Sequence, residues 1–369
     1  MISVIHVMGR MAPGGTEHQL MGMLEAAQGR YWDATLCVLS SGWELTARVR
    51  AAGVRIVELD GVNKVDLRRA VRLRRLAKQA DVVHASLWGA SAFARLVAAG
   101  PRRPALVISE RGVEDHRQPA ADFINRMLRP LTDGFIGNST AVTDFIRSTH
   151  GVAANDPRVV AIPNGLDPLT FHPIESTTFH PQRRSRLIGV GRLVPSKRFD
   201  LAISVLGHLK AVDIELVIAG DGPERARLES LAKGLPVSFL GHVSDRRALA
   251  DLLRSSDVLV MPSASEGYPN AVLEALACGL PVVASDVPGI RAVAGVGVRL
   301  VDDNTNEWCN AIREALAAPP VTSPQIADRI LSFDEVARRH LDVFEAAIAR
   351  RRQGRGRDQV LVANLPNQT

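Results

Sequence analysis

The chain has 369 residues, more than one ordinary hydrophobic core accommodates, so two domains are expected. Hydrophobic residues make up 46% of the sequence, which excludes an intrinsically disordered chain. The sequence has no run of about 18 apolar residues, so a membrane-spanning helix is not expected.

The net charge is +6, and basic residues concentrate at 64–78 and 350–357. Aromatic residues form only 4% of the chain and do not interleave with these stretches, so the sequence does not support stacking on single-stranded nucleic acid. Helix-turn-helix and zinc-finger spacings are also missing from the sequence. We therefore expect no nucleic-acid partner.

The three cysteines are Cys37, Cys278 and Cys309. They are scattered and odd in number, which fits a reducing compartment and predicts neither a disulfide framework nor a zinc cluster. Residues 1–10 lack the basic region and apolar core of a signal peptide and are expected to enter a first strand. These features predict a cytoplasmic protein, with the inner face of the membrane as an alternative location.

Apolar runs and helical stretches alternate through the first part of the chain. Strands are predicted at 3–8, 34–39, 54–59, 82–85, 105–109 and 134–138. Helices are predicted at 18–27, 45–52, 64–79, 88–99, 123–131 and 140–149. Such alternation is typical of a parallel sheet with helices on both faces, whose ligands bind beyond the carboxyl ends of the strands.

A linker is predicted up to residue 182, because this segment is rich in Pro, Thr and His and has no helical or strand period. A second alternating series follows. Its strands are predicted at 187–190, 215–219, 237–240, 258–261, 282–285 and 297–301. Its helices are predicted at 199–209, 224–233, 247–255, 269–278, 304–317, 323–330 and 333–352.

The expected domains follow from these two series. Residues 1–174 form an N-terminal Rossmann-like domain, which a C-terminal helix at about 333–352 completes. Residues 183–332 form the second domain, and residues 353–369 are expected to be a disordered tail.

The stretch 257–289 contains two carboxylates beside a helix start. Glu266 lies in a loop after a buried strand, Glu274 lies on the next helix, and Pro269 suits the first helical position. Gly279 is expected to cap that helix in the left-handed conformation. A helix N-terminus favours an anion, whereas carboxylates accept hydrogen bonds from hydroxyl groups. Together they suggest a nucleotide sugar.

Five sequence blocks point to a known family. Residues 266–274 read EGYPNAVLE, the family's E-x7-E element. The other blocks are IPNGLD at 162–167, GRLVPSK at 191–197, AGDGP at 219–223 and FLGHV at 239–243. With these blocks in this order, the chain resembles the family 4 glycosyltransferases, which are retaining enzymes of the GT-B type. The resemblance implies an α/β fold of two Rossmann-like, doubly wound domains that face each other across a cleft.

Arg192 and Lys197 follow the first strand of the second domain, at its ligand edge. Two cations there stabilise the charge of a departing diphosphate without a metal. From spacing alone, a solvated Arg and Lys in a loop are the favoured interpretation. The resemblance aligns them with the family's diphosphate-binding pair and so makes them catalytic candidates.

The resemblance also assigns the donor contacts. Glu266 matches the residue at the transferred sugar, and Glu274 matches the residue that accepts hydrogen bonds from ribose. Without the resemblance, both are ordinary loop and helix carboxylates. The remaining predicted donor contacts are the backbone of Gly267, Tyr268, Pro269 and Asn270 at the diphosphate, Val243 at the base, and the Gly14–Gly15 loop.

On the acceptor side, we name His84, Trp88, Glu110 and Arg111. Many family members have His-x-His after the fourth strand, whereas this chain has His84 followed by Ala and Ser. Glu110 stands where many members have a further His, so it is a candidate sugar contact or auxiliary base. An ion pair between Glu110 and Arg111 is the alternative interpretation.

Arginines at 68, 72 and 75 share one face of the predicted helix 64–79. This face is a candidate contact for an anionic membrane, and a solvated helix face is the alternative. No Asp-x-Asp motif stands at a strand end, so neither a metal nor another cofactor is expected.

The main hypothesis is a hexosyltransferase that moves a sugar from a nucleoside diphosphate, UDP in preference to GDP, to a hydroxyl group. The acceptor is either a lipid-linked polysaccharide precursor or a soluble metabolite. A nucleotide-sugar epimerase or hydrolase of the same fold is one alternative. A non-catalytic basic protein that binds membrane or RNA is another.

Overall fold

The computed structural model describes residues 1–60, 66–100, 103–113, 119–173, 184–209, 213–319, 321 and 330–363. The chain divides into two compact units. Unit 1 comprises residues 1–165 and 333–369, and unit 2 comprises residues 166–332. The chain therefore leaves unit 1 before residue 174, where the linker composition placed the boundary.

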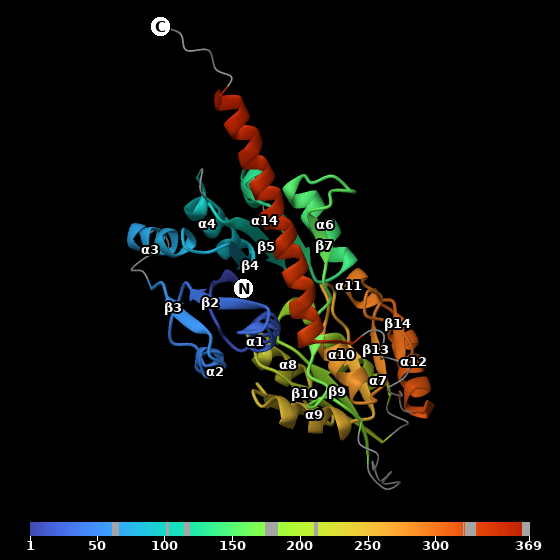
Figure 1. Cartoon of the computed structure of the whole chain (residues 1–369). Helices are drawn as coiled ribbons and strands as arrows, with labels where there is room; N and C mark the ends of the chain where they lie inside the picture. The colour runs from blue at the N-terminus through green and yellow to red at the C-terminus, as the bar shows by residue number, and fades with distance from the viewer. Residues whose placement is uncertain are drawn as a thin grey trace. The chain divides into compact units, whose positions relative to one another are not determined.

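Unit 1 is built on a parallel seven-stranded sheet in the order β3-β2-β1-β4-β5-β6-β7 (Figure 1). Its strands are β1 (Ile2–Met8), β2 (Trp32–Val38), β3 (Arg55–Glu58), β4 (Val82–Ser86), β5 (Ala105–Glu110), β6 (Gly134–Gly137) and β7 (Val159–Ala161). Its helices are α1 (Gly15–Ala27), α2 (Leu45–Ala51), α3 (Leu67–Ala77), α4 (Trp88–Ala98), α5 (Pro119–Leu128), the 3-10 turn η1 (Arg129–Leu131), α6 (Thr140–His150) and α14 (Phe333–Ala363).

Unit 2 contains a parallel six-stranded sheet in the order β11-β10-β9-β12-β13-β14. Its strands are β9 (Ser185–Val190), β10 (Ile214–Ala219), β11 (Val237–Gly241), β12 (Val258–Met261), β13 (Val282–Ser285) and β14 (Val298–Val301). Its helices are η2 (Pro195–Lys197), α7 (Phe199–His208), α8 (Arg225–Leu231), α9 (Arg246–Arg254), α10 (Asn270–Ala277), α11 (Pro288–Arg291) and α12 (Thr305–Ala317). Two short strands, β8 (Gly165–Leu166) and β15 (Leu331–Ser332), pair separately.

The central strands of unit 2 are apolar because helices cover both faces of the sheet. All four residues of β12 are buried. They alternate between two apolar clusters, since Leu259 and Met261 belong to one and Val258 and Val260 to the other. A strand buried on both faces reads as a continuous apolar run, which is why β12 and β13 were predicted with their observed bounds.

The predicted α/β fold of two doubly wound domains is confirmed, and the differences concern element ends. Helix α1 begins at Gly15 instead of residue 18, and α5 spans Pro119–Leu128 instead of 123–131. The tail expected to be disordered from residue 353 is helical up to Ala363, because two glycines weaken a helix of Arg, Gln and Leu without ending it. Parts of the predicted linker and helices, at 64–65, 174–182 and 323–329, lie outside the described residues.

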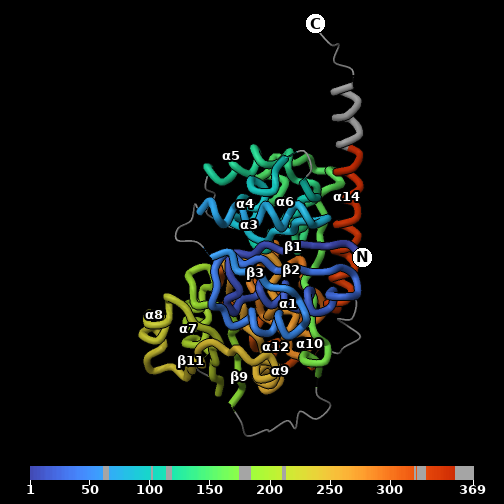
Figure 2. The backbone as a smooth tube through the Cα atoms, turned by 60° about the vertical axis from the view of Figure 1, so that its left-hand side comes forward, coloured from blue at the N-terminus to red at the C-terminus, as the bar shows by residue number. Residues whose placement is uncertain are grey.

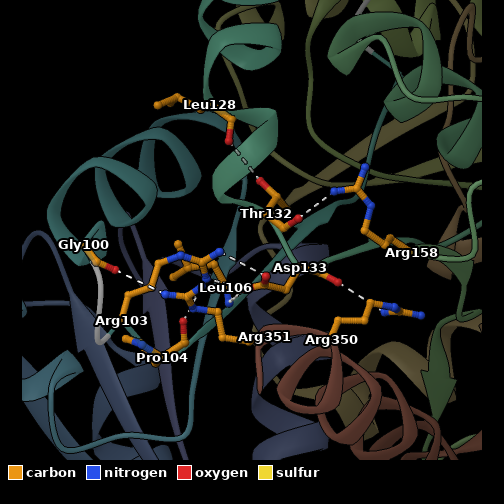
Figure 3. A network of polar contacts seen from close by, with 10 residues as sticks. All are labelled: Gly100, Arg103, Pro104, Leu106, Leu128, Thr132, Asp133, Arg158, Arg350 and Arg351. Atoms are coloured by element: carbon orange, nitrogen blue, oxygen red, sulfur yellow. Dashed lines mark hydrogen bonds and ion pairs between the residues drawn. The ribbon is translucent and has the colours of Figure 1, made fainter. Parts of the chain in front are cut away.

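Arginines near the end of α14 hold this helix to the rest of unit 1 (Figure 3). Arg350 donates to the carbonyls of Asp133 and Pro157 at 3.2 and 3.1 Å, and Arg351 donates to the carbonyl of Gly100 at 3.5 Å. Asp133 also forms a buried ion pair with Arg103. The first arginines of the basic stretch 350–357 therefore satisfy backbone acceptors at the amino-terminal edge of the sheet.

Among the described residues, no helix combines the length and the apolar composition that crossing a bilayer requires.

Candidate active site

The order of strands in unit 2 creates a switch point between β9 and β12. The chain proceeds from β9 to β10 on one side, and later places β12 on the other side of β9. The loops after β9 and β12 therefore diverge at one sheet edge, which is where ligands bind in open α/β sheets. These two loops carry Lys197 and Glu266.

Lys197 and Glu266 form an ion pair at this edge, between Nζ and Oε1. Their side chains are 22% and 10% exposed, so the pair is largely shielded but still reaches the surface. A backbone hydrogen bond of 2.8 Å from Ala264 to the Ser196 carbonyl joins the same two loops. The structure thus places a cation and a carboxylate, 69 positions apart in the chain, in direct contact.

Close backbone packing fixes the loop that carries Arg192. A Cβ on Gly220 would lie 1.8 Å from the carbonyl oxygen of Gly191, and one on Gly222 would lie 2.4 Å from that of Leu193. Only glycine fits at both positions, which explains the AGDGP block. Arg192 itself is exposed, so the loop presents a second cation to solvent near the ion pair.

Another glycine supports the Glu266 loop. A Cβ on Gly289 would lie 1.9 Å from the carbonyl oxygen of Glu266 and 2.9 Å from that of Gly267. Gly289 belongs to α11, so this short helix packs directly under the loop. The segment 286–289, with the sequence DVPG, therefore has a positioning role that its sequence alone did not indicate.

Helix α10 begins one residue later than expected. Pro269 is its N-cap, with φ of −73° and ψ of 114°, and Asn270 is the first helical residue. Gly267, Tyr268 and Pro269 are buried, whereas Asn270 is half-buried. Pro269 has no N–H, so among these four residues only Gly267, Tyr268 and Asn270 carry a backbone amide group. The predicted left-handed cap is confirmed, since Gly279 has φ of +82°.

Glu274 is buried on α10, with its side chain 4% exposed. Arg246 Nη2 donates to Glu274 Oε1 at 2.5 Å, and the Arg246 guanidinium stacks 4.7 Å from the ring centroid of Phe171. Sequence reasoning missed Arg246, although it follows β11 at the same sheet edge. Val243, in the loop after β11, is half-buried and packs against the apolar cluster that contains Leu259 and Met261.

Unit 1 has its own switch point, between β1 and β4. After β1, Gly14 is the N-cap of α1 and exposed Gly15 is the first helical residue. After β4, Leu87 has φ of +70°, a strained conformation for a branched residue. Trp88 follows as the first residue of α4 and is 39% exposed. Sequence reasoning did not identify the strain at Leu87, because no local pattern encodes it.

His84 does not lie at the sheet edge. It is 1% exposed and occupies the middle of β4, in register with His6 of β1. Its Nδ1 lies 2.9 Å from His6 Nδ1, and its Nε2 lies 2.6 Å from Ser109 Oγ. Both ring nitrogens are therefore engaged, and the prediction that His84 contacts the acceptor directly is wrong for this conformation. A two-residue period along a buried strand directs this side chain into the interior.

The hydrogen bonds around His84 fix the ring tautomers. Trp32 Nε1–H donates to His6 Nε2 at 3.1 Å, so neutral His6 carries its proton on Nδ1 and donates to His84. His84 then carries its proton on Nε2 and donates to Ser109. Burial lowers the pKa of His6 to about 3 and that of nearby His340 to about 3, which keeps these rings neutral.

Glu110 and Arg111 end β5 at the carboxyl edge of the sheet. Arg111 Nη1 donates to Asn164 Oδ1 at 3.1 Å, and burial lowers its pKa to about 10. Glu110 is 8% exposed; burial lowers the pKa of Arg95 to about 10, and the charge of Glu110 opposes that shift. The predicted position of both residues at the sheet edge is therefore observed, and Asn164 is an edge residue that the sequence did not single out.

Two arginines of α3 donate hydrogen bonds to backbone carbonyl groups. Arg69 donates to the carbonyls of Leu59 and Leu39 at 2.6 and 2.8 Å, and Arg72 donates to the carbonyl of Glu58 at 2.7 Å. These bonds satisfy acceptors near the ends of β2 and β3. Arg68, Arg72 and Arg75, which share the predicted face, are exposed, so a membrane contact of this face stays a prediction.

Two family profiles match the chain. The profile described as Glycosyltransferase Family 4 matches residues 13–168, and the profile described as Glycosyl transferases group 1 matches residues 184–318. The two matches cover the main parts of unit 1 and unit 2.

Curated relatives match over part of their length. A GDP-mannose-dependent alpha-(1-6)-phosphatidylinositol dimannoside mannosyltransferase of Mycobacterium tuberculosis is 36% identical over 211 residues, which are 55% of this chain and 54% of that protein. A D-inositol 3-phosphate glycosyltransferase of Xylanimonas cellulosilytica is 33% identical over 220 residues, 53% of this chain and 52% of that protein. In these matches the chain spans about half the length of the curated relatives.

Solved structures share the fold over nearly the whole chain. Anabaena HepE, crystallised with UDP and glucose, superposes with a TM-score of 0.78 at 17% identity and covers 94% of this chain and 100% of its own. A glycosyltransferase of Rickettsia africae gives a TM-score of 0.76 at 14% identity, with 94% and 98% covered. These similarities show the GT-B fold. The two profile matches, which together cover most of the chain, establish that it belongs to family 4 of the glycosyltransferases.

Proposed function

We propose that this protein is a retaining hexosyltransferase that moves a sugar from a nucleoside diphosphate sugar to an acceptor hydroxyl group. The observation that carries the proposal is the contact of Lys197 with Glu266 at the switch point of unit 2. One side chain suits a diphosphate and the other suits sugar hydroxyls, and the two meet at the sheet edge where an α/β fold binds ligands.

The charges support a division of roles. Breaking the bond between the sugar and the diphosphate builds negative charge on the leaving oxygens, and the cations of Lys197 and Arg192 stabilise that charge. Glu266 accepts hydrogen bonds from the transferred sugar. Because Lys197 and Glu266 pair with each other, donor binding exchanges this contact for one to phosphate and one to hydroxyl.

Retention of configuration is proposed to occur on one face of the sugar. The acceptor hydroxyl approaches from the side on which the diphosphate leaves, and a phosphate oxygen takes the acceptor proton. Positioning and leaving-group electrostatics then carry the catalysis, and the protein supplies neither a covalent nucleophile nor a strong base. No metal or other cofactor is included in this proposal.

Glu274 is proposed to hold the ribose of the donor. Arg246 occupies Oε1 of this buried carboxylate, which orients the group and leaves Oε2 as an acceptor for a ribose hydroxyl. The donor is proposed to be a UDP-sugar, as in the sugar-nucleotide complex of the fold neighbour HepE. GDP-mannose is the second candidate, because a relative at 36% identity is named as GDP-mannose-dependent.

The acceptor is proposed to be a hydroxyl of a glycolipid precursor or of a soluble polyol. The names of two relatives favour this class, since one acts on a phosphatidylinositol dimannoside and the other is a D-inositol 3-phosphate glycosyltransferase. Glu110, Arg111 and Trp88, at the carboxyl edge of the unit 1 sheet, are the proposed contacts.

A product analysis tests this function. The full chain is first screened by thermal shift against UDP-, GDP- and ADP-sugars, and the stabilising donor is then incubated with and without candidate acceptors. A new glycoside with the anomeric configuration of the donor supports the proposal. An altered or hydrolysed sugar formed without acceptor would instead indicate an epimerase or hydrolase.

A further inference from the structure

The outward face of α5 in unit 1 is apolar. Phe123 is 65% exposed, Met127 is 64% exposed and Ile124 is 36% exposed, and Ala120 is exposed beside them. The spacing 120, 123, 124 and 127 places these four residues on one side of the helix. This pattern is normally the buried side of an amphipathic helix, and here it faces solvent.

A buried polar contact on the inner side explains this orientation. Asn125 is 5% exposed, and its Oδ1 accepts a hydrogen bond of 2.8 Å from Arg95 Nη2. Arg95 on α4 is 1% exposed and donates through Nε to the Ser91 carbonyl at 3.1 Å. Rotating α5 to bury its apolar side would remove the partner of a buried guanidinium, which is unfavourable. The packing of α5 therefore keeps the apolar stripe formed by residues 120, 123, 124 and 127 exposed to solvent.

Basic residues flank the stripe. Arg126 and Arg129 are exposed, and they donate to the carbonyls of Ser148 and Gly151 at the end of α6. These bonds leave both guanidinium charges at the surface. The acidic residue of α5, Asp122, is half-buried. Among the described residues of α5 and η1, the exposed charged side chains are therefore Arg126 and Arg129, both positive.

The neighbouring helices continue this character. Helices α3, α4 and α5 pack side by side on unit 1 (Figure 2). Leu96 on α4 is 61% exposed and Val71 on α3 is 49% exposed, and Arg68 and Arg75 of α3 are exposed as well. Exposed apolar residues thus occur on all three helices, and exposed basic residues occur on α3 and α5.

We propose that α5 docks the protein on an anionic bilayer, with Phe123 and Met127 entering the headgroup region and the flanking arginines contacting anionic lipid. Apolar side chains with a basic border are the pattern of interfacial membrane helices. A second copy of the chain is a poorer occupant, because two helical turns cover on the order of a few hundred Å², below the roughly 800 Å² per partner of a stable interface. The inference extends the proposed function to its membrane partner, but its test requires no sugar transfer.

Vesicle co-sedimentation of the full chain tests this assignment. Wild type, the double variant Phe123→Ser/Met127→Ser and the control Leu231→Ser/Leu240→Ser are compared on phosphatidylcholine vesicles with and without phosphatidylglycerol. The control residues are 46% and 47% exposed in unit 2 and match the apolar change. We expect salt-sensitive binding to the anionic vesicles, weakened about tenfold in the α5 variant and unchanged in the control. Equal binding of all three proteins would overturn the proposal, as would an α5 variant that changes self-association alone.

A fluorescent label gives a second readout that does not depend on affinity. Met127→Cys carries an environment-sensitive dye, and Leu231→Cys carries it as the control. The native cysteines are buried, and burial raises the pKa of Cys37 and Cys278 to about 12, so the introduced thiol reacts first. A blue shift at position 127 alone on anionic vesicles is expected, whereas no shift there would contradict insertion.

Discussion

The carboxyl edges of the two sheets differ in how their polar residues are used. In unit 2, Lys197 and Glu266 meet at the surface, and their charges remain within reach of a ligand. In unit 1, His84 lies inside the sheet layer, and Arg111 is tied to Asn164. The edge of unit 2 thus presents charge at the surface, whereas much of the polar chemistry of unit 1 supports its own framework.

The largest expected loss of transfer activity comes from a substitution that changes the edge of unit 2 alone. In Gly289→Ala, a methyl group would lie 1.9 Å from the Glu266 carbonyl oxygen, so the Glu266 loop has to move. A displacement of about 1 Å at a positioned group reduces transfer on the order of 100-fold. Steady-state kinetics measure this loss.

The matched control for that variant is Gly207→Ala on α7, where an added methyl meets only ordinary contacts near 3.9 Å. If Gly289→Ala retained wild-type kcat and KM, the support of the loop by α11 would be refuted.

Unit 1 is expected to be the acid-sensitive part of the protein. His6 and His340 have a pKa of about 3 in the fold, against 6.5 for an exposed histidine. Below pH 6.5 the histidines of the unfolded chain take up protons, whereas the buried rings of the folded chain do not. The free energy of unfolding is therefore highest above pH 6.5 and decreases as the pH falls. The loss is about 2 kcal/mol for each histidine by pH 5.

Urea unfolding at a series of pH values measures how the free energy of unfolding changes with pH. The other titratable groups that face His6 and His340 are His84 and Arg111. His340→Gln is expected to reduce the slope below pH 6.5, whereas His208→Gln, at an exposed position, leaves it unchanged. Equal slopes in wild type and His340→Gln would show that burial does not hold His340 neutral.

A smaller effect is expected at Arg246. Arg246→Ala removes the partner that orients buried Glu274, so the KM for the donor rises about tenfold while kcat changes less. The exposed neighbour Arg247 supplies the control, Arg247→Ala. A variant that lost kcat with an unchanged KM would place Glu274 outside the donor site.

Short-range chemistry made the elements at the edge of unit 2 predictable. A buried strand, a loop and a Gly-capped helix follow one another at 258–279. The sequence therefore predicted that Glu266 lies in the loop and Glu274 on the helix. The order of the strands then brought Lys197 to Glu266, as the rule for switch points requires.

The missed features depend on contacts between distant segments. His84 meets His6 because β4 pairs in register with β1, and Arg246 meets Glu274 from a different helix. Neither partner is marked in the sequence by spacing or composition. The outward apolar side of α5 was also missed, because an amphipathic pattern alone does not say which side faces solvent.

Donor binding to unit 2 tests the central claim most directly. Isothermal titration of the intact protein with the donor found by thermal shift is compared for wild type, Lys197→Ala and the exposed-lysine control Lys233→Ala. The account predicts at least about tenfold weaker binding for Lys197→Ala and wild-type affinity for the control. Equal affinity of all three proteins would contradict the assignment of the donor diphosphate to the edge formed by Lys197 and Glu266.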